Sequence, residues 1–578
     1  MAATILIKGN AIFDGMADAP FPGAVAIEGN RITAVLRADG GADSSGSGSR
    51  AEGAGGSGSG SCAGGTDFGG LVGAGTQVID AGDRLVLPGF HDNHVHLLMA
   101  GMFREYVNLS SARSAEEAAR MAWESSRKRV DNDVARSSHG SSQGKGWLVG
   151  FQWYHIFWDV PEMPTKETLD RYFPDRPVFL LNAEAHGCWL NSRGLAEAGI
   201  TKDTPDPPVG VIVRDAAGEP TGILLEGAAA LATQHALVFT PDRERALIRA
   251  YMEGARAYGI TSITDVQPYF HGNMGDLSVY SAMDRENALT TRIHVAPDLL
   301  GDLDEVLAWR DAYRSERITV NHVKQFLDGV VTTHTALLLE DYADEPGQKG
   351  IELFDLDAIR KAIPEAHRRG LSLKLHCIGD RAARIALDNI EEAIRLHGDT
   401  GCRHAIEHCE LVDEADIPRF GQLGVIPSMQ PDHLALTQVF AENPYPSLLG
   451  ERRARDTMRW KTLLGAAGVL AAGSDCPVVD NNPFKEIHRA RTRVHDDGEP
   501  AGGWNPPEKL TMSEVLRAYT YGSAYSVKRE QELGSLRAGN FADIAVLDRN
   551  LFETAPEDIL DAKVDLTVFD GQVVYERE

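Results

Sequence analysis

Two histidines, His94 and His96, stand two positions apart in HDNHVH, directly after the apolar run LVLPGF. Side chains two positions apart in a β-strand leave the same face, about 6.6 Å apart along the backbone, so two such imidazoles can bind one metal ion. Many HxH pairs are purely structural. The position of this pair at the C-terminal end of an apolar strand, where the active sites of β/α barrels lie, favours a metal site.

Three further apolar segments end in a similar way. SLKLHCIGD contains His376, RHAIEHCELV contains His408, and GVLAAGSDCPV contains Asp475. A single buried histidine is more often a core residue than a ligand, but separate strands that all end in metal-ligand residue types indicate one shared site. A metal ion would lower the pKa of water from about 16 towards 7, and Asp475 could accept the released proton and return it to a leaving amine.

A cysteine directly follows each of these last three residues, at Cys377, Cys409 and Cys476. Strand alternation points the thiols away from a metal that the preceding side chain faces, so we assign them to packing. The six cysteines of the chain have neither the density of a disulfide framework nor the spacing of a CxxC zinc site, which indicates free thiols in a reducing compartment.

Short apolar runs alternate with helical segments along most of the chain, which is the pattern of a parallel β/α fold. Eight strands would close a barrel with the polar strand ends at one mouth. The expected strands are Leu87 to Val95, Ile263 to Val266, Ile293 to Val295, Ile318 to Phe326, Leu371 to His376, His404 to His408, Val425 to Ser428 and Val469 to Ser474.

The rest of the chain predicts accessory parts. Both chain ends are rich in short strands and turns and could complete one sheet. Residues 38–76 consist largely of Gly, Ser and Ala, so we expect a flexible, dispensable excursion. The aromatic-rich stretch 98–249 is too long for one crossover helix, which predicts an insertion over one mouth of the barrel.

The motifs PGFHDNHVH, VKQFLDG, HCIGDRA, IEHCELV and GSDCPV occur in this order. Together they resemble the amidohydrolase superfamily, and within it the family-three branch that includes N-substituted formamide deformylases and YtcJ-like proteins. The resemblance implies that His94 and His96 bind one metal ion and that Lys324, often N-carboxylated in this family, bridges two. It further implies that His376 and His408 hold the second ion and that Asp475 handles protons.

The same resemblance implies a (β/α)8 TIM-type barrel over residues 87–530, with the insertion after its first strand. A small β-sandwich would be built from residues 1–86 and 531–578. The segment NAEAHGCWLNS matches a family segment with a histidine, an aromatic residue and an asparagine, here His186, Trp189 and Asn191. We expect these to face the substrate, with His186 donating to a developing oxyanion, although an anchoring role in the insertion explains His186 equally well.

Three carboxylates lie beside the expected ligands in sequence: Asp92, Asp328 and Glu407. Each could orient an imidazole or be an ordinary strand-end carboxylate. His91 replaces the small apolar residue that many relatives have at this position. Neutral imidazoles suit zinc, manganese or cobalt, and we expect one or two ions, with zinc first.

Composition excludes several classes of function. The chain has 57 basic and 84 acidic side chains, and its formal net charge of −27 repels phosphate backbones and anionic lipid surfaces. No apolar run approaches the roughly 20 residues that a membrane span needs, and the N-terminus lacks the basic and apolar regions of a signal peptide. We therefore expect a cytoplasmic protein without nucleic-acid or membrane partners, and a homodimer by default.

The predicted function is hydrolysis of a carbon–nitrogen bond, in a small and partly apolar amide or N-substituted formamide, by metal-activated water. One alternative is a hydrolytic deaminase or another reaction of the same superfamily. A second alternative is a non-enzymatic regulatory protein that retains the fold, but a scaffold has no need for five buried polar ligands.

Overall fold

The computed structural model describes residues 3–38, 70–136, 146–183, 187–207, 210–237, 239–267 and 274–578. Most of the Gly/Ser-rich stretch, residues 39–69, lies outside these ranges, and so does His186. The predictions made for that stretch and for His186 therefore stay predictions.

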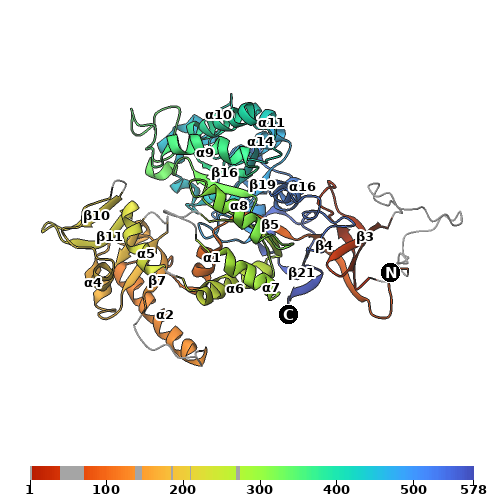
Figure 1. Ribbon diagram of the computed structural model, residues 1–578, viewed down its shortest axis with the longest axis horizontal. Coiled ribbons are helices and arrows are strands. Elements are labelled where there is room, and N and C mark those ends of the chain that lie inside the picture. Colours follow the sequence, from red (N-terminus) through yellow and green to blue (C-terminus); the bar gives the residue numbers. More distant parts are fainter. Residues whose placement is uncertain are drawn as a thin grey trace.

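Two parallel sheets form the centre of the molecule (Figure 1). One has the strand order β14-β13-β12-β5 and the other β15-β16-β17-β18-β19. Every strand pair in them is parallel, which confirms the β/α prediction. The strands are β5 (Phe90–Val95), β12 (Ile260–Val266), β13 (Arg292–Ala296), β14 (Ile318–Thr319), β15 (His322–Phe326), β16 (Ser372–Cys377), β17 (Ala405–His408), β18 (Ile426–Met429) and β19 (Ala471–Ala472).

Helices separate these strands along the chain, and their apolar faces form the main core with the sheets. α9, for example, buries Leu356, Ile359 and Ile363 on one side, at the spacing expected of an amphipathic helix. The helices are α1 (Leu97–Glu105), α6 (Pro241–Ala257), α7 (Leu277–Arg285), α8 (Leu303–Ala312), α9 (Leu356–Arg368), α10 (Asp380–His397), α11 (Ile417–Leu423), α12 (Tyr445–Leu449), α13 (Glu451–Arg455), α14 (Trp460–Ala467), α15 (Pro483–Thr492), α16 (Met512–Arg517) and α17 (Ser523–Ser526).

The two parallel sheets meet through isolated parallel bridges. Val95, at the end of β5, pairs with Cys476 beyond β19, and Asp298 beyond β13 pairs with Lys324 in β15. The edges of the two sheets are thus in contact on both sides, and their C-terminal strand ends point to a common region.

Three strand boundaries differ from the prediction. Leu87 belongs to β4 of another sheet, and the chain changes sheets at Gly89, where a Cβ atom would lie 2.2 Å from Thr261 Oγ1. The strand expected at Ile318 to Phe326 is divided into β14 and β15. The last strand ends at Ala472, so Asp475 lies in the following loop, with a left-handed φ of 63°.

Strands from both chain ends form one seven-stranded sheet, with the order β22-β21-β20-β4-β1-β2-β3. The expectation that the two ends complete one sheet is confirmed, and Figure 1 shows both termini beside it. Its strands are β1 (Ile5–Ile12), β2 (Phe21–Glu28), β3 (Arg31–Arg37), β4 (Gln77–Pro88), β20 (Ile544–Leu547), β21 (Val564–Phe569) and β22 (Gln572–Glu576).

The stretch between α1 and α6 has a six-stranded sheet of its own, which lies at the opposite end of the molecule in Figure 1. A separate core that includes Trp153, Trp158 and Trp189 packs beneath this sheet. Its elements are β6 (Val107–Asn108), α2 (Ala115–Arg136), β7 (Leu148–Trp153), α3 (Lys166–Asp170), β8 (Val178–Asn182), β9 (Gly187–Leu190), α4 (Ser192–Glu197), β10 (Gly210–Arg214), β11 (Pro220–Glu226) and α5 (Ala230–Ala236).

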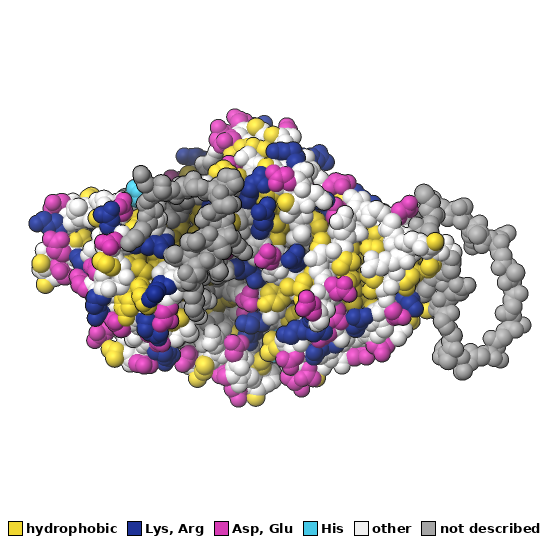
Figure 2. All heavy atoms as spheres, turned by 90° about the horizontal axis from the view of Figure 1, so that it is seen from below, with side chains coloured by type: hydrophobic (Ala, Val, Ile, Leu, Met, Phe, Trp, Pro, Cys, Tyr) yellow, Lys and Arg dark blue, Asp and Glu magenta, His cyan; other side chains and the backbone are white. Residues whose placement is uncertain are grey.

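The surface carries many acidic and basic side chains (Figure 2), as the composition of the chain predicts. Figure 2 shows acidic and basic side chains intermixed over the face that it presents. Within the described ranges, no helix combines the length and the apolar character that a membrane crossing requires.

Candidate metal centre

The structure brings five predicted ligands and the predicted acid/base together at the C-terminal ends of the parallel strands. Asp475 is central, because its Oδ1 lies 3.4 Å from the Nε2 atoms of both His94 and His96. Lys324 Nζ lies 3.4 Å from His94 Nε2. The HxH pair thus converges as its spacing predicted, with ring centroids 5.8 Å apart.

His376 and His408 complete the cluster. Their ring centroids are 4.3 Å apart, and the ring of His408 is 5.1 Å from that of His94. Neither ring nitrogen of the buried His408 has a hydrogen-bond partner within the described part of the chain. Buried polar atoms are normally paired, so two unpaired nitrogens facing other ligand types fit a metal-binding role.

Burial keeps three of these imidazoles, those of His94, His376 and His408, neutral. It lowers the pKa of His94 to about 4 and holds the pKa values of His376 and His408 well below the ordinary histidine value. A neutral imidazole offers the lone pair that a metal ion binds. Burial also lowers the pKa of Lys324, to about 8.

Glu407 orients one imidazole. His94 Nδ1 donates to Glu407 Oε2 over 2.7 Å, so the Nε2 lone pair of His94 faces the cluster. Lys374 Nζ donates to the other oxygen of Glu407 over 3.0 Å. Burial raises the pKa of Glu407, but Lys374 and His94 outweigh that effect and leave the pKa lowered, so this group is a carboxylate.

Sequence reasoning missed Lys374, which is completely buried. One signal was available, because in SLKLHC the lysine stands two positions before His376, on the same strand face. A lysine in the middle of an apolar strand needs a buried anionic partner, and that partner is Glu407 on the neighbouring strand.

Asp92 and Asp328 accept hydrogen bonds from backbone N–H groups rather than from imidazoles. Asp92 accepts hydrogen bonds from the backbone N–H and the hydroxyl of Ser474, which ties the end of β5 to the loop that carries Asp475. Asp328 accepts from three backbone N–H groups and lies 3.9 Å from His376 Nε2. Burial raises the pKa of Asp92 to about 7 and that of Asp328 to about 8.

His433 is a further neighbour of Asp475. Its Nε2 lies 3.7 Å from Asp475 Oδ2, and its ring stacks nearly parallel on His408, with centroids 5.7 Å apart. The motif SMQPDHL makes His433 the next acid/base candidate after Asp475 from the sequence alone, but only the structure shows that the two side chains are neighbours.

Three residues at the site have a strained backbone conformation. His408, Cys409 and Asp475 have φ angles of 71°, 48° and 63°, a left-handed conformation that is unfavourable for residues with a Cβ atom. Cys377, Cys409 and Cys476 lie in the main apolar core, as their assignment to packing predicted.

The expectation that Trp189 and Asn191 face the substrate is wrong. Trp189 is fully buried in the core of the insertion, and its Nε1 donates to the Thr165 carbonyl. Asn191 is the N-cap of α4 and uses both ends of its amide for backbone hydrogen bonds. Their polar atoms are already paired inside the fold, so they have a structural role.

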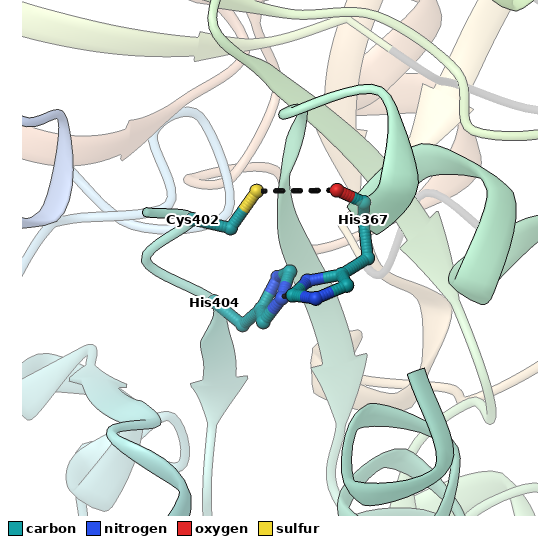
Figure 3. A group of neighbouring side chains, drawn as sticks. All are labelled: His367, Cys402 and His404. Carbon is teal, nitrogen blue, oxygen red and sulfur yellow. Dashed lines mark hydrogen bonds between the residues drawn. The ribbon is translucent and has the colours of Figure 1, made fainter. Parts of the chain in front are cut away.

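A second cluster of ligand types, His367, Cys402 and His404, lies at the opposite ends of the strands (Figure 3). The Leu373 N–H donates to His404 Nδ1, so His404 carries its proton on Nε2, which is 2.9 Å from His367 Nδ1. His367 Nε2 in turn donates to the Gly398 carbonyl. The His404 nitrogen that faces the cluster is therefore protonated, and His367 and His404 form a structural chain of hydrogen bonds.

Comparison with known proteins gives three relatives along nearly the whole chain. The chain is 29% identical to Protein LONG AFTER FAR-RED 3 of Arabidopsis thaliana, over 100% of this chain and 92% of that protein. It is 29% identical to the putative amidohydrolase YtcJ of Bacillus subtilis, over 87% and 91% of the two chains. It is 26% identical to the N-substituted formamide deformylase of Arthrobacter pascens, over 89% and 92%.

A solved structure shares the fold. An uncharacterized metal-dependent hydrolase from Pyrococcus horikoshii superposes with a TM-score of 0.73, over 96% of this chain and 99% of that one, at 22% identity. The pattern of the amidohydrolase family matches residues 77–575, a range that includes all the site residues described above. The chain therefore belongs to the metal-dependent amidohydrolase family.

Proposed function

We propose that this protein hydrolyses a carbon–nitrogen bond of a small amide or N-substituted formamide with the help of one or two bound divalent ions. The observation that carries the proposal is the buried cluster in which four imidazoles, Lys324 and Asp475 converge, and in which neither nitrogen of His408 has a hydrogen-bond partner among the described residues. The name of the deformylase from Arthrobacter pascens supports the proposed bond type.

The donor groups of the clustered side chains are of the types that bind divalent metal ions. His94, His96, His376 and His408 would bind the ions, and Lys324 would join them after carboxylation, in which its neutral amine attacks carbon dioxide and loses a proton. A bound divalent ion supplies Lewis acidity, which polarises a carbonyl and makes water acidic enough to ionise near neutral pH. Zinc is the ion that we propose first.

Asp475 would move the proton. Its Oδ1 lies between His94 and His96, where it can accept a proton from attacking water, and the protonated carboxyl group can then donate to the leaving nitrogen. The carbonyl carbon gains a bond to oxygen, the carbon–nitrogen bond breaks, and the products are a carboxylic acid and an amine.

The proposal includes the architecture that carries the site. We propose that the two parallel sheets form one (β/α)8 barrel over residues 87–530, with an insertion at about residues 98–249. Segments 1–86 and 531–578 would form a β-sandwich. The bridges Val95–Cys476 and Asp298–Lys324 support closure, because they join the sheets at both edges.

A substrate panel tests the reaction. Purified protein loaded with zinc, manganese or cobalt is incubated with N-formyl, N-acyl and cyclic amides, and the carboxylate, amine and ammonia released are measured. Release of a carboxylate and an amine in equal amounts is the expected result. Release of ammonia alone would identify a deaminase, and protein that neither binds metal nor turns over any amide would contradict the proposal.

A further inference from the structure

Gln430, which directly follows β18, carries a buried amide that has nothing to bind within the fold. Only 3% of the residue is exposed, yet neither Nε2 nor Oε1 has a hydrogen-bond partner among the described residues. Buried polar atoms are normally paired, because an unpaired one has lost its hydration without compensation. A side-chain amide that is unpaired at both ends therefore indicates a residue that binds a ligand.

Strand alternation shows where this amide points. Ser428, two positions earlier, accepts a hydrogen bond from Asn93 Nδ2 over 3.0 Å, and Asn93 lies on β5 directly before His94. The face of β18 that carries Ser428 is thus turned towards β5. Gln430 leaves the same face, since its φ of −124° and ψ of 89° are still close to extended. Its amide therefore faces the space between the sheets, nearer to the C-terminal strand ends.

The strands on either side of β18 carry parts of the metal centre. β17, which ends at His408, pairs with β18 on one side. On the other side, the Gly473 N–H donates to the Met429 carbonyl over 3.0 Å, and Asp475 follows two positions later. Gln430 is the next residue after Met429. It therefore stands between the strand end of His408 and the loop of Asp475.

The backbone of Gln430 is held firmly although its side chain is unpaired. Its carbonyl accepts from the His433 N–H over 3.1 Å, which begins the tight turn after β18. α15 anchors this turn, because Glu486 accepts from the Asp432 N–H over 2.9 Å and Arg489 donates to the Asp432 carboxylate over 3.0 Å. A fixed backbone with a free polar group is the arrangement that binds a ligand at little entropic cost.

The proposed reaction requires control of the leaving nitrogen. After water adds to the carbonyl, the carbon–nitrogen bond is a single bond about which the nitrogen can rotate. Its lone pair must face Asp475 to receive the proton. In a secondary amide the same nitrogen carries an N–H, so an acceptor beside Asp475 that binds this N–H stops the rotation and directs the lone pair.

We infer that Gln430 is a substrate-binding residue whose Oε1 accepts a hydrogen bond from the N–H of the scissile amide, so that the enzyme selects secondary over tertiary amides. The inference rests on the proposed function for the identity of that nitrogen. A tertiary amide has no N–H and would leave Oε1 buried without a partner. Loss of such a pairing is a strong source of discrimination between substrates.

The kinetic test compares N-benzylacetamide with N-benzyl-N-methylacetamide on zinc-loaded protein. Wild-type enzyme should favour the secondary amide by at least about 10-fold in kcat/KM. Gln430→Met keeps the length of the side chain but removes both polar atoms. It should lower kcat/KM for the secondary amide by about 10-fold to 100-fold and for the tertiary amide by less than about 3-fold. Gln430→Glu keeps an accepting oxygen and should retain the preference.

The matched control is Gln325→Met, at a buried glutamine whose amide is already paired with Asp298 and with the Phe326 N–H. It should lower the urea midpoint and leave the ratio of the two substrates unchanged. Gln430→Met should leave the urea midpoint unchanged or raise it, because no protein hydrogen bond is lost. An unchanged substrate ratio in Gln430→Met, or a fall of its midpoint as large as that of the control, would overturn the inference.

A binding measurement separates this inference from the proposed function. In saturation-transfer NMR with zinc-loaded wild-type protein, the secondary amide should show stronger transfer than the tertiary amide, and in Gln430→Met the two should be equal. If this result were obtained without turnover of any amide, the role of Gln430 would stand and the proposed reaction would fall. Equal hydrolysis of both amides by wild type would remove that role from an active hydrolase, and so would the absence of transfer to either.

Discussion

Lys324 is buried among imidazoles and lies 3.4 Å from His94 Nε2, with no carboxylate within salt-bridge distance among the described residues. An ammonium group would repel metal ions bound there, whereas a carbamate is an anionic, two-oxygen ligand. Lys324→Ala should therefore lose metal and activity, as measured by metal analysis and turnover on one preparation. Added formate or acetate should restore part of both.

The control for this variant is Lys202→Ala, at an exposed lysine of the insertion. It should keep wild-type metal content and turnover. Wild-type metal occupancy in Lys324→Ala would show that this lysine does not bridge.

Asp475 has two oxygens in different surroundings, one beside His94 and His96 and the other beside His433. Asp475→Asn keeps the shape of the side chain but removes the base. A positioned acid/base group contributes about 10²–10⁴-fold, so kcat should fall by at least that range while metal content falls far less. Near-wild-type turnover in metal-loaded Asp475→Asn would assign proton transfer elsewhere, with His433 as the next candidate.

At the scale of elements, the loop after β19 must pass close to the end of β5. A Cβ atom on Gly473 would lie 2.4 Å from the His94 backbone nitrogen and 2.9 Å from Asp92 Oδ1. Gly473→Ala should therefore displace Asp475 from the histidines and lower metal affinity, turnover and melting temperature together.

Gly465→Ala is the matched control, since nothing lies within 4 Å of its Cβ position on α14. It should raise the free energy of unfolding by about 0.5–1 kcal/mol through its helix propensity, with no change in metal binding. If Gly473→Ala bound metal as well as Gly465→Ala, the close approach would not control the site.

The hydrogen bonds of His367 and His404, two of the residues drawn in Figure 3, connect the ends of α9 and α10 to β16 and β17. They also make stability depend on pH. Burial lowers the pKa of His404 to about 3, below an unfolded value of about 6.5. Between these values the unfolded chain binds the extra proton, so stability is lost as pH falls through this window. The loss from His404 should reach about 2 kcal/mol at pH 5.

Urea unfolding at pH 7.5 and pH 5 measures this effect. His404→Gln cannot titrate, so its pH-dependent loss should be smaller than that of wild type by about 2 kcal/mol, although the variant is less stable at pH 7.5. His397→Gln, at an exposed position on α10, should behave as wild type. An unchanged pH dependence in His404→Gln would show that the folded protein accommodates the charged ring.

At the scale of the whole molecule, buried ion pairs connect the central sheets to the sheet of the chain ends. Arg292, on β13, is fully buried and donates to Asp543 over 2.7 Å and to Asp570 over 2.9 Å, and both aspartates belong to the C-terminal segment. Removing one partner of a buried pair costs about 3–5 kcal/mol, because the other charge stays buried.

Arg292→Met should therefore shift the urea midpoint downwards by an amount that corresponds to about 3–5 kcal/mol. Arg310→Met is the control, because Arg310 pairs with Asp311 at the surface, where such a pair contributes about 0–1 kcal/mol. Equal effects of the two changes would mean that the Arg292 contacts do not hold the sheets together.

The sequence alone predicted most of the central strands and placed histidines at the ends of three of them, although three strand boundaries differ in the structure. His94 and His96 follow the two-residue repeat of a β-strand, and apolar runs precede His376 and His408. Such patterns involve only neighbouring residues, so they can be seen in the sequence itself. That repeat also predicted that the cysteines pack in the core. Lys324 was proposed only because of the family resemblance, since no sequence pattern around it indicates a metal ligand.

Only the tertiary structure decided the contacts between residues far apart in the chain. Ser474 is 382 positions from the Asp92 that binds it, and no local pattern indicates that pair. The partnership of Lys374 with Glu407 and the approach of His433 to Asp475 likewise depend on which strand ends meet. Trp189 and Asn191 were assigned wrongly for the same reason, because whether a polar atom faces a ligand or a backbone partner is fixed by packing across the whole fold.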